Sequence, residues 1–370
     1  AITETTTQAI VVSPPIYGVE WDGTASSAFT RTDVAANFAD PVPYYSGMTG
    51  TPSSPFDNIK PWSQMTIVED ENCGKMVRIP KFWYKLTQNG ASLKIQISST
   101  QQDGFSVSPA HMNRNDQYGK FTECNNVYVS RYLIRNGSGD YKSQTGVQGS
   151  SLHHNTRSYD ANLFVKSYDD YRTLPFDFAT LYTIWLLYLV EFADWNSQAK
   201  IGYGCNMQAS STSSSSVSDY YTGATDSMNY HTGTTSATKS AYSRTQYRNI
   251  EGLWDGISQW LHGCYIDRYT GATQGSNDIF HIILDPYKFS DSYMTPRLDI
   301  GWALSGYPKT FAINNDWFPL FYPTAVGGDG TTYMTDQQGG TKSTPCIISV
   351  SSGSKSESCG MFYFGGRATS

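Results

Sequence analysis

The sequence predicts an α+β fold in which short strands and long loops surround one or two helices. Strand-like runs rich in β-branched and aromatic residues recur along most of the chain. One strongly apolar stretch, residues 180–193, is typical of a buried helix. No repeat with a period of about 20–50 residues is evident, which disfavours solenoids and propellers. Strands that are not interleaved regularly with helices favour α+β.

The N-terminal part of the chain is predicted to be β-rich. Residues 1–13 resemble an extended arm or an edge strand, and ordered structure is expected to begin at Tyr17. Residues 28–61 are rich in Pro, Gly, Ser and Asp, so long irregular loops are expected there. The next strand-like runs are residues 65–68, 76–86, 92–97 and 126–134.

A helix is predicted from about Phe178 to Gln198, with Asp177 as its N-cap. Its apolar run contains Glu191 and is followed by Asp194, so it falls short of the ~20 residues that a membrane span needs. We therefore expect a buried helix and no insertion into a membrane. The first residues lack both the charged and the apolar part of a secretory signal peptide.

Beyond the helix, the sequence predicts more strands and loops. Residues 210–218 are a serine-rich, low-complexity segment and are expected to form a loop. Residues 249–265 predict a turn that leads into a Trp-rich strand. After residues 317–323, short strands alternate with loops of Gly, Ser and Thr.

The six cysteines do not form a zinc motif, because no two of them have the C-x2-C spacing. They are too sparse for a disulfide scaffold in 370 residues, so buried thiols are expected, although Cys346 and Cys359 could bridge neighbouring strands. The adjacent His153 and His154 diverge on a strand and cannot easily chelate one ion. We therefore predict neither a metal nor a cofactor.

Composition and motifs favour binding over catalysis. Only 16% of the residues are charged and no basic stripe is present, which excludes nucleic acid as an expected partner. The 27 Tyr and 9 Trp are typical of extracellular β-rich proteins and of binding surfaces. The Gly-x-Ser-x-Gly motif is absent, and residues 339–343 lack the spacing of a phosphate-binding loop. No enzymatic activity is predicted.

Three stretches, in order, resemble the formylglycine-generating-enzyme type of the C-type-lectin fold. Residues 171–188 resemble the entry into its helix, residues 249–263 its turn and Trp-rich strand, and residues 359–367 its last strand. The resemblance covers roughly residues 120–370. It implies a C-type-lectin-like domain at residues 121–370, preceded by an arm and a β-rich region at residues 1–120.

Within that fold, the chain resembles tail-tip proteins of gut phages, including the variable proteins of diversity-generating retroelements. Residues 79–86, 192–204 and 247–255 carry most of this resemblance. It implies an exposed variable region at about residues 329–367 that contacts a host receptor. The implied contact residues are Asp329, Thr331, Tyr333, Thr335, Asp336, Gln337, Gln338, Ser351, Ser352, Ser354, Lys355, Ser356, Phe364 and Arg367.

The composition of this region agrees with such a division of labour. The apolar residues of 345–350 and 361–364 can hold a sheet by themselves, whereas the intervening loops are polar. Substitutions in those loops are expected to change stability by no more than about 0.5 kcal/mol. A binding site placed on loops over a rigid scaffold can therefore change without unfolding the protein.

The resemblance further implies a location on the virion and a host cell-surface protein or glycan as partner. It also allows a homotrimer and contacts with other tail proteins. The Glu-Pro-Asn and Gln-Pro-Asp tripeptides of calcium-dependent sugar-binding lectins do not occur, so that activity is not expected. Two alternatives stay open: an oxidase of the formylglycine-generating type, which would need Cys346 and Cys359 as its cysteine pair, and a structural virion protein that does not touch the receptor.

Overall fold

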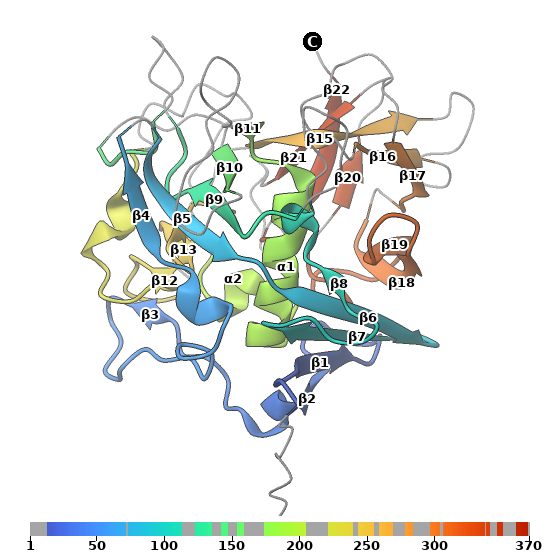
Figure 1. Cartoon of the computed structure of the whole chain (residues 1–370), viewed down its shortest axis with the longest axis horizontal. Coiled ribbons are helices and arrows are strands. Elements are labelled where there is room, and N and C mark those ends of the chain that lie inside the picture. Colours follow the sequence, from blue (N-terminus) through green and yellow to red (C-terminus); the bar gives the residue numbers. More distant parts are fainter. Residues whose placement is uncertain are drawn as a thin grey trace, which may run out of the picture.

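A computed structural model gives the fold as a helix surrounded by sheets (Figure 1). The structure describes residues 13–71, 73–112, 123–134, 142–146, 154–158, 174–204, 221–239, 243–254, 259–268, 278–283, 297–303, 306–336, 338–340, 346–350 and 360–368. Strands are much more frequent than helices in these ranges. The predicted α+β class is therefore confirmed. The serine-rich segment at 210–218 and the arm up to residue 12 lie outside the described residues.

The predicted buried helix is α1 (Phe178–Phe192), and it stands in the middle of the molecule (Figure 1). All of its residues are buried, and it contacts strands from both the N-terminal and the C-terminal parts of the chain. Asp177 is the N-cap, as predicted, and its side chain accepts a hydrogen bond of 2.8 Å from the backbone N–H of Thr180. That bond satisfies one of the donors that a helix start leaves open.

The helix ends six residues earlier than predicted. Ala193 adopts a left-handed conformation (φ 53°), and its N–H bonds to the carbonyl of Leu189. The turn directs Trp195 into the core, where its ring stacks on Phe311 at 5.5 Å. A short helix, α2 (Ser197–Lys200), then begins with Asn196 as its N-cap. Burial of one large aromatic side chain thus overrides a helix propensity that the sequence pattern carries through residue 198.

Two antiparallel sheets come mainly from the first half of the chain. The first has the order β2 (Phe29–Asp33), β1 (Tyr17–Trp21), β7 (Ser92–Ser98), β6 (Trp83–Asn89) and β8 (Ser106–Val107). The second has the order β11 (Leu174–Pro175), β10 (His154–Ser158), β9 (Asn126–Ser130), β5 (Gly74–Pro80) and β4 (Ile67–Asp70).

The predicted strand at 76–86 is two strands in two different sheets. Pro80 ends β5, since proline cannot donate to a ladder, and the chain then crosses to β6. The prediction of only irregular loops for 28–61 is wrong at β2, which pairs along its whole length with β1. β2 carries mostly polar residues, and that hid it from a search for apolar alternation.

The remaining strands form two further sheets and a hairpin. The small sheet has the order β14 (Ile250–Glu251), β13 (Thr245–Tyr247), β12 (Gly233–Thr234) and β3 (Tyr44–Tyr45). The large sheet has the order β17 (Arg297–Gly301), β16 (Asp278–Ile283), β15 (Gln259–Arg268), β21 (Cys346–Val350), β22 (Phe364–Ala368) and β20 (Gln338–Gly340). β18 (Pro308–Asn314) pairs with β19 (Leu320–Val326). Short 3-10 helices are η1 (Val34–Asn37), η2 (Trp62–Gln64), η3 (Pro109–His111) and η5 (Ala224–Ser227).

One main hydrophobic core joins the two parts of the chain. It runs from Tyr17 to Phe362 and includes most of the buried aromatic side chains. Residues on both sides of position 120 share this core. The division into an N-terminal region and a C-type-lectin-like domain therefore stays a prediction. Cys124 and Cys264 are buried thiols whose Sγ atoms donate to backbone carbonyls, as predicted for them. No helix in the described ranges has the length and apolar character needed to span a bilayer.

Candidate functional site

The structure describes only part of the predicted receptor-binding region. Phe364 and Arg367 lie on β22, which pairs with β21 on one side and with β20 on the other, although the side chains of these two residues are not described. Six other predicted contact residues lie outside the described residues: Gln337, Ser351, Ser352, Ser354, Lys355 and Ser356. Cys359 is also outside them, so the oxidase alternative stays a prediction.

The loop after β19 carries three of the predicted contact residues toward the surface. Asp329 and Thr331 are exposed, and Tyr333 is half-buried. Asp329 Oδ1 accepts hydrogen bonds from the N–H (2.9 Å) and the hydroxyl (2.6 Å) of Thr331, which fixes the turn locally. Tyr333 has a left-handed backbone (φ 56°), donates its N–H to the carbonyl of Thr24, and lies under the ammonium of Lys309. The outer part of this loop is therefore exposed and held in one conformation.

The expectation that Thr335, Asp336 and Gln338 are exposed is wrong. These side chains are 1%, 0% and 0% exposed. Gln338 Oε1 accepts a 2.6 Å hydrogen bond from the indole of Trp302. Asp336 and Gln338 form hydrogen bonds inside the fold, as buried polar groups usually do, whereas the Thr335 hydroxyl is buried without a hydrogen-bond partner among the described residues. The sequence alone could not show whether these polar residues are buried or are exposed contact residues.

Asp336 fastens the end of the loop to the turn that precedes β22. Its two carboxylate oxygens accept hydrogen bonds from the N–H groups of Gly360 (2.9 Å) and Phe362 (2.8 Å). Burial raises the pKa of Asp336 to about 7, although the two hydrogen bonds oppose this shift. The same turn is tied to the helices, since Trp185 donates to the carbonyl of Met361 and Ser197 Oγ accepts from its N–H.

A second polar site lies on the opposite flank of α1, at an open pocket beside β4 and β5. The β4–β5 hairpin contributes Ile67 and Lys75, the segment after η5 contributes Tyr230 and His231, and β13 contributes Gln246. In Figure 1 these elements lie on the left, whereas β18, β19, β20 and β22 lie on the right. The predicted receptor-binding loop and this pocket are therefore separate surfaces.

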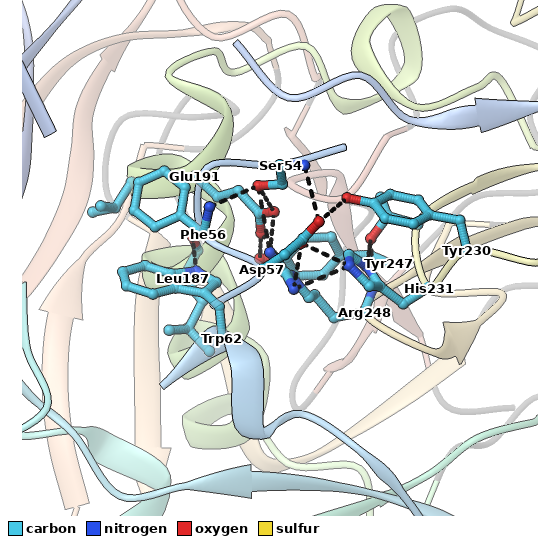
Figure 2. A network of polar contacts seen from close by, with 12 residues as sticks. Ser54, Phe56, Asp57, Trp62, Leu187, Glu191, Tyr230, His231, Tyr247 and Arg248 are labelled. Atoms are coloured by element: carbon cyan, nitrogen blue, oxygen red, sulfur yellow. Dashed lines mark hydrogen bonds and ion pairs between the residues drawn. The ribbon is translucent and has the colours of Figure 1, made fainter. Parts of the chain in front are cut away.

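A buried ion pair lies next to Tyr230 and His231, two residues that line the pocket (Figure 2). Arg248 and Glu191 are almost completely buried, and the guanidinium donates to both carboxylate oxygens of Glu191, at 3.1 and 2.5 Å. Ser54 and Tyr247 donate their hydroxyls to the same carboxylate at 2.8 and 3.0 Å. The charge of Glu191 is thus compensated by one cation and by further donors, as a buried carboxylate requires.

Asp57 extends this network to the two aromatic residues of the pocket. Its carboxylate lies 3.2 Å from Arg248 Nη1 and 2.9 Å from His231 Nε2, and it accepts 2.7 Å from the Tyr230 hydroxyl. Burial alone would raise the pKa of Asp57, but the hydrogen bonds from His231 and Tyr230 and the charge of Arg248 lower it to about 2. The rings of Tyr230 and His231 are therefore oriented by an ionised carboxylate.

Sequence reasoning missed this site, although one signal for it was present. Glu191 lies inside a helix that is apolar on most sides, and an ionised carboxylate at such a position needs a buried cation. The sequence does not indicate which cation, because Arg248 is 57 positions away. Arg248 and Asn249 both have positive φ (46° and 70°), a conformation that the turn imposes on them.

Within the ranges that the structure covers, no group of three or more His, Cys, Asp or Glu side chains converges as a metal site would require. Comparison of the chain with protein-family models, with curated proteins and with solved structures finds no match.

Proposed function

We propose that this protein is a receptor-binding protein of a phage tail tip, which contacts a host surface molecule through exposed loops carried on a rigid aromatic core. The observation that carries the proposal is the contrast within residues 329–336. Asp329 and Thr331 face solvent, whereas Met334, Thr335 and Asp336 are buried, and the hydrogen bonds that Asp336 accepts fasten the loop.

This contrast meets the physical requirements of a changeable binding surface. Contacts made by Asp329 and Thr331 do not contribute to the core, so their replacement is expected to leave the fold intact. The anchor at Asp336 limits the conformations of the loop before binding, which lowers the entropy that binding must remove. Several copies on one virion would strengthen weak single contacts.

We infer that residues 121–370 form a C-type-lectin-like domain of the formylglycine-generating-enzyme type. The order of a buried helix, a turn with a Trp-rich strand and a closing strand supports this assignment. In such a domain, β21 and β22 would be the strands that border the variable loops.

The test is adsorption of purified full-length protein to cells of the bacterium that the phage infects. Thr331→Arg places a bulky cation on the exposed loop and is expected to lower the bound fraction at least about tenfold by disrupting shape complementarity. Thr49→Arg is the matched control, because Thr49 is an exposed threonine on the loop after β3. Equal adsorption of the Thr331→Arg variant and the parent would refute the proposal.

A further inference from the structure

The pocket beside β4 and β5 combines an apolar wall with a polar floor. Ile67, at 44% exposure, is one of the few large apolar residues open to solvent in the described chain, and Met228 lies near it in the pocket. The rings of Tyr230 and His231, with centroids 4.0 Å apart, add an aromatic surface. An exposed isoleucine beside aromatic rings indicates a surface that an apolar face of a ligand can cover.

The floor of the pocket holds its polar groups in fixed positions. Arg131 is 4% exposed and donates from Nε and Nη2 to Asp226 Oδ1 at 3.2 and 3.0 Å. It also donates from Nη1 to the carbonyl of Asn249 at 2.9 Å, so it joins two segments of the pocket rim. The second carboxylate oxygen, Asp226 Oδ2, lies 3.9 Å from Lys75 Nζ. A charged donor and a charged acceptor thus face the same space, and both are about one-third exposed.

Gln246 fixes the aromatic side of the pocket. Its side chain lines the pocket and is 2% exposed, and its Nε2 donates to the carbonyl of Tyr230 at 2.8 Å. Its Oε1 is buried without a hydrogen-bond partner among the described residues. Buried polar atoms in folded proteins almost always have a partner. Because Oε1 is closed to solvent, Gln246 holds Tyr230 in place, whereas the polar groups of the pocket that are open to solvent include Lys75 and Asp226.

We propose that this pocket binds a sugar unit with neighbouring hydroxyl groups. A hydroxyl group both donates and accepts, so one sugar can donate to Asp226 Oδ2 and accept from Lys75. The C–H face of the sugar ring matches Ile67, Met228 and the Tyr230 ring. A simple anion fits less well, because Asp226 already faces both cations of the pocket. The proposal goes beyond the receptor-binding loop, since it concerns a second surface on the other side of α1 (Figure 1).

The test is saturation-transfer NMR and titration of the full-length protein with galactose, N-acetylglucosamine and N-acetylneuraminic acid, with inorganic phosphate as the anion probe. At least one sugar is expected to bind with a Kd on the order of 1 mM, as ligands of this size typically do. Lys75→Met keeps the aliphatic stem but removes the donor, and it is expected to weaken the binding about 5- to 10-fold. Ile67→Ser is expected to weaken it by a similar factor, because it removes the apolar wall.

The matched controls lie outside the pocket. Lys94 is 28% exposed and pairs with Asp33, much as Lys75, at 34%, faces Asp226, so Lys94→Met controls for loss of a lysine. Ile279 is 37% exposed on β16, and Ile279→Ser controls for loss of an exposed isoleucine. Three results would overturn the proposal: no sugar bound at about tenfold above that Kd, unchanged binding in folded Lys75→Met and Ile67→Ser, or phosphate binding in place of sugar. None of them depends on Thr331 or on adsorption to cells.

Discussion

The two flanks of α1 each contain a buried carboxylate, but they stabilise it in different ways. On the pocket side, Glu191 is paired with the guanidinium of Arg248 and accepts two further hydroxyl donors. On the loop side, Asp336 accepts hydrogen bonds from the backbone N–H groups of Gly360 and Phe362, and the charge among the described residues that raises its pKa is the like charge of Asp194. Among the described residues, one carboxylate is thus compensated by a cation and the other by backbone dipoles.

The two buried carboxylates therefore affect the stability of the fold in different ways. The Glu191–Arg248 pair joins α1 to the turn after β13, and it fails if either partner is removed. Asp336 joins two loops, and it can become neutral at ordinary pH because burial raises its pKa to about 7. We therefore expect the pocket side to depend on complementary charges and the loop side to depend on pH.

The largest effect is expected from breaking the ion pair. Arg248→Met leaves Glu191 buried without its cation and should lower the free energy of unfolding by about 3–5 kcal/mol, measured by urea denaturation. The double variant Glu191→Gln with Arg248→Met removes both charges and should recover part of that loss. If the double variant is as unstable as Arg248→Met alone, the charge of Glu191 is not the cause.

The next effect is the pH dependence of the loop side. The folded-state pKa of Asp336, about 7, exceeds the unfolded value of about 3.9, so its protonated form is favoured by folding. Stability from this group is complete below about pH 4 and is lost as the pH rises to about 7, by roughly 2–4 kcal/mol. Asp336→Asn should flatten the curve between about pH 4 and pH 7. An unchanged slope in that variant would assign the dependence to other groups.

The pH dependence of stability that Asp57 contributes on the pocket side has the opposite sign. Its folded-state pKa, about 2, lies below the unfolded value, so its contribution is present above about pH 4 and is lost as the pH falls toward 2. A pH titration of stability therefore distinguishes the two flanks.

A smaller effect tests the neutral hydrogen bond at the turn that Asp336 holds. Ser197→Ala removes the hydroxyl that accepts from Met361 N–H at 2.8 Å, and this buried N–H then lacks that acceptor. We expect a loss of about 1–2 kcal/mol, independent of pH between 5 and 8, in thermal or urea unfolding. A loss that grows with pH would show that Ser197 and Asp336 act as one coupled unit.

The smallest effect is expected at the exposed loop. Thr331→Ala removes a hydroxyl that, among the described residues, bonds to Asp329 in the same loop, and it should change stability by less than about 0.5 kcal/mol. Unfolding curves of this variant and the parent should nearly coincide. A cost above about 1 kcal/mol would contradict the division into an anchored end and an exposed, changeable outer part.

The sequence predicted the elements that local chemistry defines. The helix with its Asp177 cap and the β7 and β9 strands follow from apolar patterns and capping rules. The end of α1 was misplaced because the conformation of Ala193 depends on burial of Trp195 against Phe311, a residue more than 100 positions away.

The candidate sites were harder to predict for the same reason. A polar residue in a polar stretch of the sequence can be an exposed contact residue, as proposed for Thr331, or a buried hydrogen-bond acceptor, as Asp336 is. Only the positions of Gly360 and Phe362 distinguish the two cases. The pocket depends on segments that contain residues 67, 75, 131, 226 and 246, which no local pattern brings together.

The position of Met361 and Phe362 also has a consequence for biosynthesis. Both side chains are completely buried against a core that begins at Tyr17, and Met361 accepts from the indole of Trp185. The core therefore cannot close while the ribosome still holds residue 362, and until then α1 lacks part of its cover. Nascent chains of this protein should need protection by chaperones until translation has passed that point.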